Sequence, residues 1–179
     1  MKNKILPPTY FLISFILIIV SHFIFPIIKI IHLPYNWIGV ILIIFGSAIN
    51  LWVDNIFKKK ETTVNPYEKP NILITSGPFR LSRHPMYLGM TTILFGIAIL
   101  LGSLISFIFP IIFAILMQKL FIPVEEKNLE ILFGQKYLNY KKKINFGLKL
   151  KNTPFGVFFN LFFIIQTSAI LALILIKSQ

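Results

Sequence analysis

The chain has 179 residues, of which 56% are hydrophobic and 13% are charged, with a formal net charge of +12. A soluble domain of this size could not bury so much apolar surface, so the mean hydropathy of +0.79 indicates that lipid surrounds much of the chain. The absence of cysteine excludes disulfides, a thiolate nucleophile and a cysteine-ligated metal. His22, His32 and His84 show no metal-ligand spacing, and there is no glycine-rich nucleotide-binding loop, so we predict neither a metal nor a Rossmann or P-loop site.

Five segments are apolar and long enough to cross a bilayer, which takes about 20 residues. They lie at 8–31, 36–57, 85–101, 103–123 and 155–176. We therefore predict an all-α, polytopic membrane protein with about five transmembrane helices. Pro26 should kink the first span, and Gly102-Ser103 leaves almost no loop between the third and fourth, which predicts a helical hairpin. Gly89 and Gly96 share one face of the third span and would let a helix or a flat ligand approach closely.

The basic residues predict the orientation of these spans. Fifteen of the 18 Lys and Arg residues lie before the first span, in residues 58–84 and in residues 124–153. By the positive-inside rule, these three regions, the first of which is the N-terminus, face the cytoplasm. The same distribution accounts for the net charge without nucleic acid as a partner. Lysine-, isoleucine- and phenylalanine-rich usage fits a bacterial inner membrane, which is the predicted location.

The second of the long cytoplasmic segments, 124–143, is predicted to be an amphipathic continuation of the fourth span. On a helical wheel Glu125 shares the apolar, inward face, whereas Glu126 sits at its border and Glu130 points outward. A charged side chain at the end of an apolar span is costly, so the glutamate pair is a candidate functional feature. We expect Gly134 to end this helix.

The start of the third span brings several polar groups to one point. Pro85 suits the first position of a helix, because its missing N–H costs nothing there, and this makes His84 the helix cap. The helix N-terminus and the Arg83 and His84 side chains together predict a binding point for a carboxylate or phosphate, with Tyr87 one turn further in. The alternative is structural: Arg83 and His84 would anchor a helix at the lipid headgroups, and the glutamate pair would brace two helices.

The motifs occur in a fixed order: Leu73–Arg80, then Arg83-His84-Pro85-Met86-Tyr87-Leu88-Gly89, then Glu125–Leu129, then Phe133–Tyr137 with Tyr140. Together they resemble the isoprenylcysteine carboxyl methyltransferase family, in the broader group with the phospholipid methyltransferases. The resemblance covers residues 61–145. It divides the chain into an N-terminal two-span region (1–60), a cofactor-binding core (61–145) and a C-terminal transmembrane helix (146–179).

The resemblance implies a membrane methyltransferase that uses S-adenosylmethionine and acts on a lipophilic acceptor entering from the bilayer. It implies a cofactor site lined by Asn71, Ile72, Leu73, Ile74, Phe79, His84, Pro85, Tyr87 and Glu125. The cofactor's carboxylate would meet the helix terminus at His84, and its ammonium and ribose hydroxyls would meet Glu125 or Glu126. The predicted catalytic residues are Arg83 and Glu126, the latter as the base that an amine acceptor requires.

One departure from the family leaves the acceptor open. The eukaryotic isoprenylcysteine enzymes carry an arginine just before the glutamate pair, whereas this chain has Phe121-Ile122-Pro123-Val124 there, with Lys119 as a partial substitute. Phosphatidylethanolamine or another lipophilic amine, acid or thiol is therefore an alternative to a prenylcysteine carboxylate. Two other interpretations are an NADPH-dependent, sterol-reductase-like membrane enzyme and a non-catalytic membrane scaffold.

Overall fold

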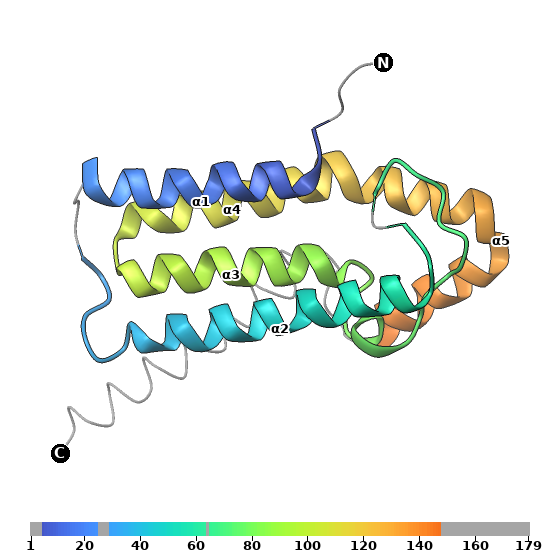
Figure 1. The fold of residues 1–179 in the computed structure, drawn as a ribbon, viewed down its shortest axis with the longest axis horizontal. Coiled ribbons are helices and arrows are strands. Elements are labelled where there is room, and N and C mark those ends of the chain that lie inside the picture. The colour runs from blue at the N-terminus through green and yellow to red at the C-terminus, as the bar shows by residue number, and fades with distance from the viewer. Residues whose placement is uncertain (1–4, 25–28, 64, 148–179) are drawn as a thin grey trace.

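The computed structural model describes residues 5–24, 29–63 and 65–147. Within them the chain forms helices joined by turns and loops, and contains no β-strand, as predicted. Helices α1, α2, α3 and α4 run side by side, and α5 continues from the end of α4 (Figure 1). The predicted fifth span, 155–176, and the predicted kink at Pro26 lie outside the described residues.

Three helical stretches are long and apolar enough to cross a membrane: Pro7–Ile24 (α1), Trp37–Lys59 (α2) and Leu104–Ile144. Helix α3, Pro85–Leu101, is apolar but has only 17 residues. The predicted end of the first span, residue 31, is wrong, because α1 ends at Ile24. The backbone N–H of Ile30 instead donates to the carbonyl of Gly102 at 2.9 Å, which ties the following loop to the turn between α3 and α4.

That turn is the predicted helical hairpin. Gly102 caps α3 in the left-handed conformation (φ 69°), which glycine adopts without steric cost, and its N–H donates to Ala98 at 3.0 Å. A short 3-10 helix, Leu104–Phe107, then leads directly into α4, Ile108–Leu116. The hairpin prediction is confirmed.

Helices α2 and α3 pack along a seam of four glycines, which we call the glycine seam. A Cβ added at Gly39 would lie 2.3 Å from the Gly96 carbonyl oxygen, and one added at Gly46 would lie 2.6 Å from that of Gly89. Such distances are far inside van der Waals contact, so these backbones touch only because no side chain intervenes. The predicted face of Gly89 and Gly96 therefore receives a helix, α2.

Helix α4 continues through a π-helical turn, Met117–Phe121, into α5, Ile122–Gly147. Pro123 has no N–H to donate to the carbonyl four residues earlier. That carbonyl lies within the π turn, so the α-helical hydrogen bond is lost where the π turn forms. The run Leu104–Ile144 has 41 residues, about twice what a bilayer needs. Because charged residues gather from Glu125 onward, we take the membrane-spanning part to end near Pro123.

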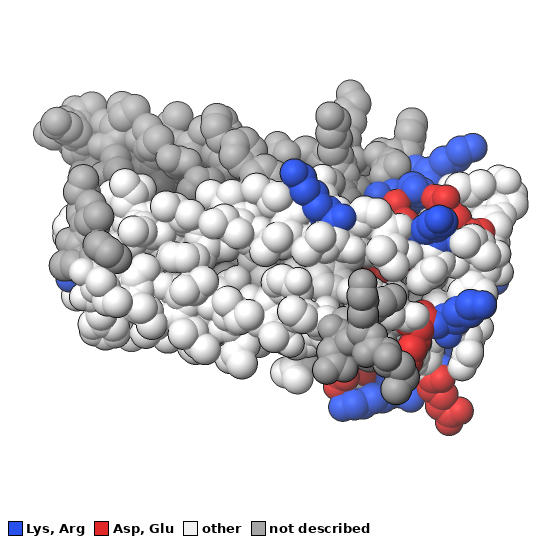
Figure 2. Space-filling model, turned by 90° about the horizontal axis from the view of Figure 1, so that it is seen from above, with Lys and Arg blue, Asp and Glu red and all other residues white. Residues whose placement is uncertain are grey.

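Helix α5 bends sharply at Gly134, whose φ of 48° and ψ of −126° are not helical. The prediction that Gly134 ends this helix is confirmed, because the range Ile122–Gly147 consists of two helices that meet at this kink, and the second continues to Gly147. We call residues 135–147 the return arm, because this half of α5 folds back toward the end of α2 and the loop before α3 (Figure 1). Charged side chains gather at this end of the molecule, while the helical body shown in Figure 2 is largely free of them.

Candidate functional site

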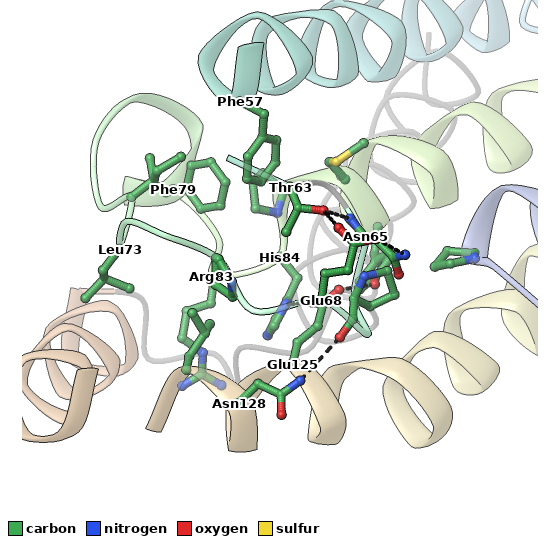
Figure 3. Close-up of a pocket in the computed structure, with 18 of the residues that line it drawn as sticks. Phe57, Thr63, Asn65, Glu68, Leu73, Phe79, Arg83, His84, Glu125 and Asn128 are labelled. Atoms are coloured by element: carbon green, nitrogen blue, oxygen red, sulfur yellow. Dashed lines mark hydrogen bonds and ion pairs between the residues drawn. The ribbon is translucent and has the colours of Figure 1, made fainter. Parts of the chain in front are cut away.

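A cavity of about 380 Å³ lies at the charged end of the helices (Figure 3). Its walls come from the start of α1, the end of α2, the first turns of α3 and α5, and the segment 61–76, which we call the strap. Most of the lining is apolar or aromatic, and its ionisable side chains are Glu68, Arg83, His84, Glu125 and Tyr residues. A concave, mainly apolar space with few polar groups is typical of small-molecule sites.

His84 organises the polar wall of this cavity. It caps α3 with Pro85 in the first helical position, as predicted, and its side chain is buried. Its Nδ1 lies 2.9 Å from Oε2 of Glu125, and its Nε2 lies 3.4 Å from Oε1 of Glu126. The ring of Tyr87 stacks near that of His84, with centroids 6.0 Å apart, and the Tyr87 hydroxyl donates to the other oxygen of Glu125. Both oxygens of Glu125 are thus engaged by the protein.

Glu126 joins three cations. Besides His84, it accepts from Nη2 of Arg83 at 2.8 Å and from Nζ of Lys141 at 2.7 Å. Lys141 belongs to the return arm and also contacts Glu130 at 2.7 Å, so one lysine bridges both halves of α5. Glu125 faces inward and lines the cavity, as the helical wheel predicts. Its side chain is 23% exposed, and that of Glu126 is 14% exposed because Lys141 of the return arm covers Glu126.

We call Arg83, His84, Glu125, Glu126, Glu130 and Lys141 the charged cluster. Their contacts shift the pKa values of Glu126 and His84. Burial raises the pKa of Glu126, but hydrogen bonds from His84 and Lys141 and the charge of Arg83 outweigh it and lower that pKa to about 2. Burial lowers the pKa of His84, but the hydrogen bonds that its ring donates to Glu125 and Glu126 and the charges of these two carboxylates outweigh burial and raise that pKa above its ordinary value. Both ring nitrogens of His84 face carboxylate oxygens, so its raised pKa favours the imidazolium form, and the lowered pKa of Glu126 makes Glu126 a poor general base.

The structure brings most of the predicted site residues to the cavity wall. Arg83 lines it, as do Ile72, Leu73, Ile74, Phe79, His84, Pro85, Tyr87 and Glu125. Asn71 and Glu126 are not among the lining residues, and Glu126 reaches the cavity only through its contacts with Arg83 and His84. Lys119 is exposed on the π turn and does not line the cavity.

The start of α3 near His84 is predicted to receive a ligand's carboxylate or phosphate. In the structure the carboxylates that His84 contacts are those of Glu125 and Glu126. The protein therefore supplies its own anions at this point. A ligand would meet the outer faces of this assembly, where Arg83 and the aromatic rings line the cavity.

Sequence reasoning missed the first half of the strap. Thr63, Asn65 and Glu68 line the cavity from the strap, and Asn128 lines it from α5, where its amide donates to the carbonyl of Pro66 at 3.4 Å (Figure 3). Asn65-Pro66 signals a turn, but a turn signal does not say which way the next carboxylate points. Tyr140, from the return arm, donates to the carbonyl of Phe79 at 2.7 Å and closes the far wall.

Comparison with known proteins agrees with this geometry. The family model for phospholipid methyltransferases matches residues 35–136, which include α2, the strap, α3 and the glutamate pair. The chain belongs to the phospholipid methyltransferase family.

Among its relatives are several isoprenylcysteine enzymes. The chain is 30% identical over 118 residues to a probable protein-S-isoprenylcysteine O-methyltransferase of Oryza sativa subsp. indica, covering 63% of this chain and 60% of the relative. It is 34% identical over 85 residues to the protein-S-isoprenylcysteine O-methyltransferase of Schizosaccharomyces pombe, covering 46% and 35%. For the Saccharomyces cerevisiae enzyme the identity is 36% over 84 residues, covering 45% and 34%. The matched part thus spans from about a third to 60% of these relatives. No solved structure matches the chain significantly.

Proposed function

We propose that this integral membrane protein is a methyltransferase that takes its methyl group from S-adenosylmethionine and transfers it to a lipophilic acceptor. The observation that carries the proposal is the cavity at the charged end of apolar helices, with the His84–Glu125–Tyr87 hydrogen-bond system in its wall. The names of the matched relatives support the reaction class. The basic residues at this end support a cytoplasmic site in a bacterial inner membrane.

The residues present fit this cofactor. A volume of about 380 Å³ falls within the range of about 300–1,000 Å³ for small-molecule sites. Phe79, Tyr87 and Met86 provide flat or polarisable surface, while Arg83 and Asn128 offer donors at the wall. When bound, S-adenosylmethionine would supply a methyl group on a sulfonium, which is already a good leaving group. The work left to the protein is to position the reactants and exclude water.

The charged cluster behind the cavity wall can position the reactants. Glu126 holds Arg83 and His84 in place, and Lys141 holds Glu126, so the cavity presents side chains that are fixed before a ligand arrives. Because the pKa of Glu126 is lowered to about 2, it does not serve as the base that an amine acceptor needs. This favours an acceptor that is already an anion at neutral pH. We therefore propose a carboxylate on a lipophilic molecule as the acceptor, oriented by hydrogen bonds that the Arg83 guanidinium donates.

A binding and turnover experiment on the full chain in lipid nanodiscs tests the proposal. S-adenosylhomocysteine at about 100 times its dissociation constant should stabilise the folded state by about 2.7 kcal/mol, and NADPH should not. Labelled methyl from S-adenosylmethionine should then appear on a prenylated cysteine carboxylate and not on phosphatidylethanolamine. Stabilisation by NADPH alone would refute the proposal, and methylation of the amine alone would refute the carboxylate assignment.

A further inference from the structure

The ionised groups behind the cavity wall neutralise one another. Three cations, from Arg83, His84 and Lys141, face the three carboxylates of Glu125, Glu126 and Glu130. His84 counts as a cation because both ring nitrogens face carboxylate oxygens, and both must then be donors. This cluster therefore contributes no net charge to the cavity.

Glu68 lies outside that cluster. It lines the cavity from the strap, where Thr63 and Asn65 lie beside it (Figure 3). Its carboxylate accepts from the Thr63 hydroxyl and from the Asn65 amide, the latter at 2.8 Å, and both donors are neutral. Among the described residues no Lys, Arg or His forms an ion pair with it. The cavity thus carries one carboxylate that no cation among the described residues balances.

The strap holds this carboxylate in a fixed orientation. The Thr63 hydroxyl also accepts from the backbone N–H of Asn65 at 3.1 Å, and the Asn65 side-chain oxygen accepts from the N–H of Tyr67 at 3.1 Å. Asn128 ties the same stretch to α5 through the Pro66 carbonyl. An unbalanced charge that is oriented in this way favours a ligand with a complementary charge.

We propose that Glu68 is the counter-ion for the sulfonium of the methyl donor and makes the site distinguish the donor from its demethylated product. The inference rests on the proposed function, and it names a residue that the sequence resemblance did not. S-adenosylmethionine carries one more positive charge than S-adenosylhomocysteine, and the unbalanced carboxylate matches that difference. Glu125, which was expected to meet a positive group of the cofactor, already has both oxygens engaged by His84 and Tyr87.

The size of the effect follows from exposure. Glu68 lies at the rim and is exposed to solvent, which screens its charge, so we expect roughly a fivefold preference rather than several orders of magnitude. Glu68 therefore adjusts selectivity, while the apolar and aromatic walls supply most of the affinity.

Calorimetric titration of the full chain in nanodiscs tests this inference with three ligands. These are S-adenosylmethionine, S-adenosylhomocysteine and sinefungin, which carries an amine where the donor carries its sulfonium. Glu68→Gln should weaken S-adenosylmethionine and sinefungin roughly fivefold and should change S-adenosylhomocysteine by less than about twofold. Glu61→Gln is the matched control, because Glu61 is an exposed strap residue that does not line the cavity, and it should change none of the three.

The outcomes separate the two proposals. Equal weakening of all three ligands, or no weakening of the two cationic ones, would overturn the role of Glu68 while leaving the proposed function intact. Failure of the unsubstituted protein to bind any of the three would overturn both. A difference between the cationic and neutral ligands that shrinks with added salt only when Glu68 is present would support the inference.

Discussion

The glycine seam and the charged cluster hold the same helix by opposite means. Along the seam the backbones of α3 and α2 meet directly, at the Gly39 and Gly96 pair and at the Gly46 and Gly89 pair. At its N-terminus α3 is held by His84, which binds two carboxylates of α5. In lipid the first kind of contact depends on shape and the second on charge. The seam should therefore govern whether the protein folds, and the cluster should govern what it binds and at which pH.

The largest expected effect is on the seam. Gly39→Val would place a Cβ 2.3 Å from the Gly96 carbonyl oxygen and 2.8 Å from the Leu100 backbone nitrogen, neither of which can move freely. We expect a loss of about 3 kcal/mol in the free energy of unfolding, or failure to fold. Ala48→Val adds two methyl groups on the exposed face of the same helix and serves as the control. Thermal unfolding in nanodiscs measures both; equal stability of the two variants would mean that the seam does not direct packing.

The next effect is a pH dependence that belongs to the cluster. The pKa of Glu126 falls from an ordinary value of 4.5 to about 2 in the folded protein. Its ionised form therefore stabilises the fold above about pH 4.5, and this contribution is lost as the pH falls toward 2. His84, whose pKa is raised, stays protonated in both states across this window. Glu126→Gln should remove about 2 kcal/mol of the pH-dependent stability between pH 5 and 2.

This pH-dependent stability is measured as the melting temperature at a series of pH values. The melting temperature of the unsubstituted protein should fall more steeply on acidification than that of Glu126→Gln. Glu130→Gln is a useful comparison, since Glu130 contacts Lys141 alone among the three cations. Parallel curves for the unsubstituted protein and Glu126→Gln would contradict the assignment of the low pKa to Glu126.

A smaller change is expected in binding. His84→Ala removes the group that orders Glu125 and Glu126, and we expect S-adenosylhomocysteine affinity to fall at least tenfold, or about 1.4 kcal/mol. The fold should persist, because the seam is untouched. His22 lies near the end of α1, whereas only the start of α1 lines the cavity, so the His22→Ala variant should bind S-adenosylhomocysteine normally. Isothermal titration decides this, and a folded His84→Ala protein with unchanged affinity would remove His84 from the site.

The smallest effect concerns the return arm. Lys141→Met breaks its contacts with Glu126 and Glu130, and because the lysine side chain is 29% exposed we expect at most about 1 kcal/mol. Hydrogen exchange of residues 135–147 should rise while exchange in the seam stays constant. Lys142→Met, which changes an exposed neighbour, is the control. Exchange that rises equally in both variants would mean that Lys141 does not secure the arm.

Local chemistry explains what the sequence predicted well. Long apolar runs predicted the helices, Gly102 predicted the hairpin, and Pro85 predicted that His84 caps α3. Each of these depends on a few neighbouring residues. The end of the first span was misplaced because the hydrogen bond of Ile30 to Gly102 joins residues far apart in the chain.

The charged cluster shows why the rest could not be predicted. A helical wheel treats α5 as straight and alone, so it could not show that the bend at Gly134 brings Lys141 onto Glu126. Likewise, the local sequence around Glu68 does not show that this part of the strap lines the cavity. The π turn before Pro123 was missed as well, since apolar periodicity does not distinguish it from an α-helical turn.

The glycine seam has a consequence for where the site sits in the membrane. Helix α3 has 17 residues, which is about 25 Å of helix against a hydrocarbon thickness of about 30 Å. A helix that is too short normally thins the bilayer or shifts along its axis. Two glycine contacts spaced seven residues apart along α3 prevent such sliding, because a shift by one turn would set side chains against both backbones. The depth of His84 is therefore set by α2 and not by lipid thickness, so the site should keep its position in membranes of different acyl-chain length.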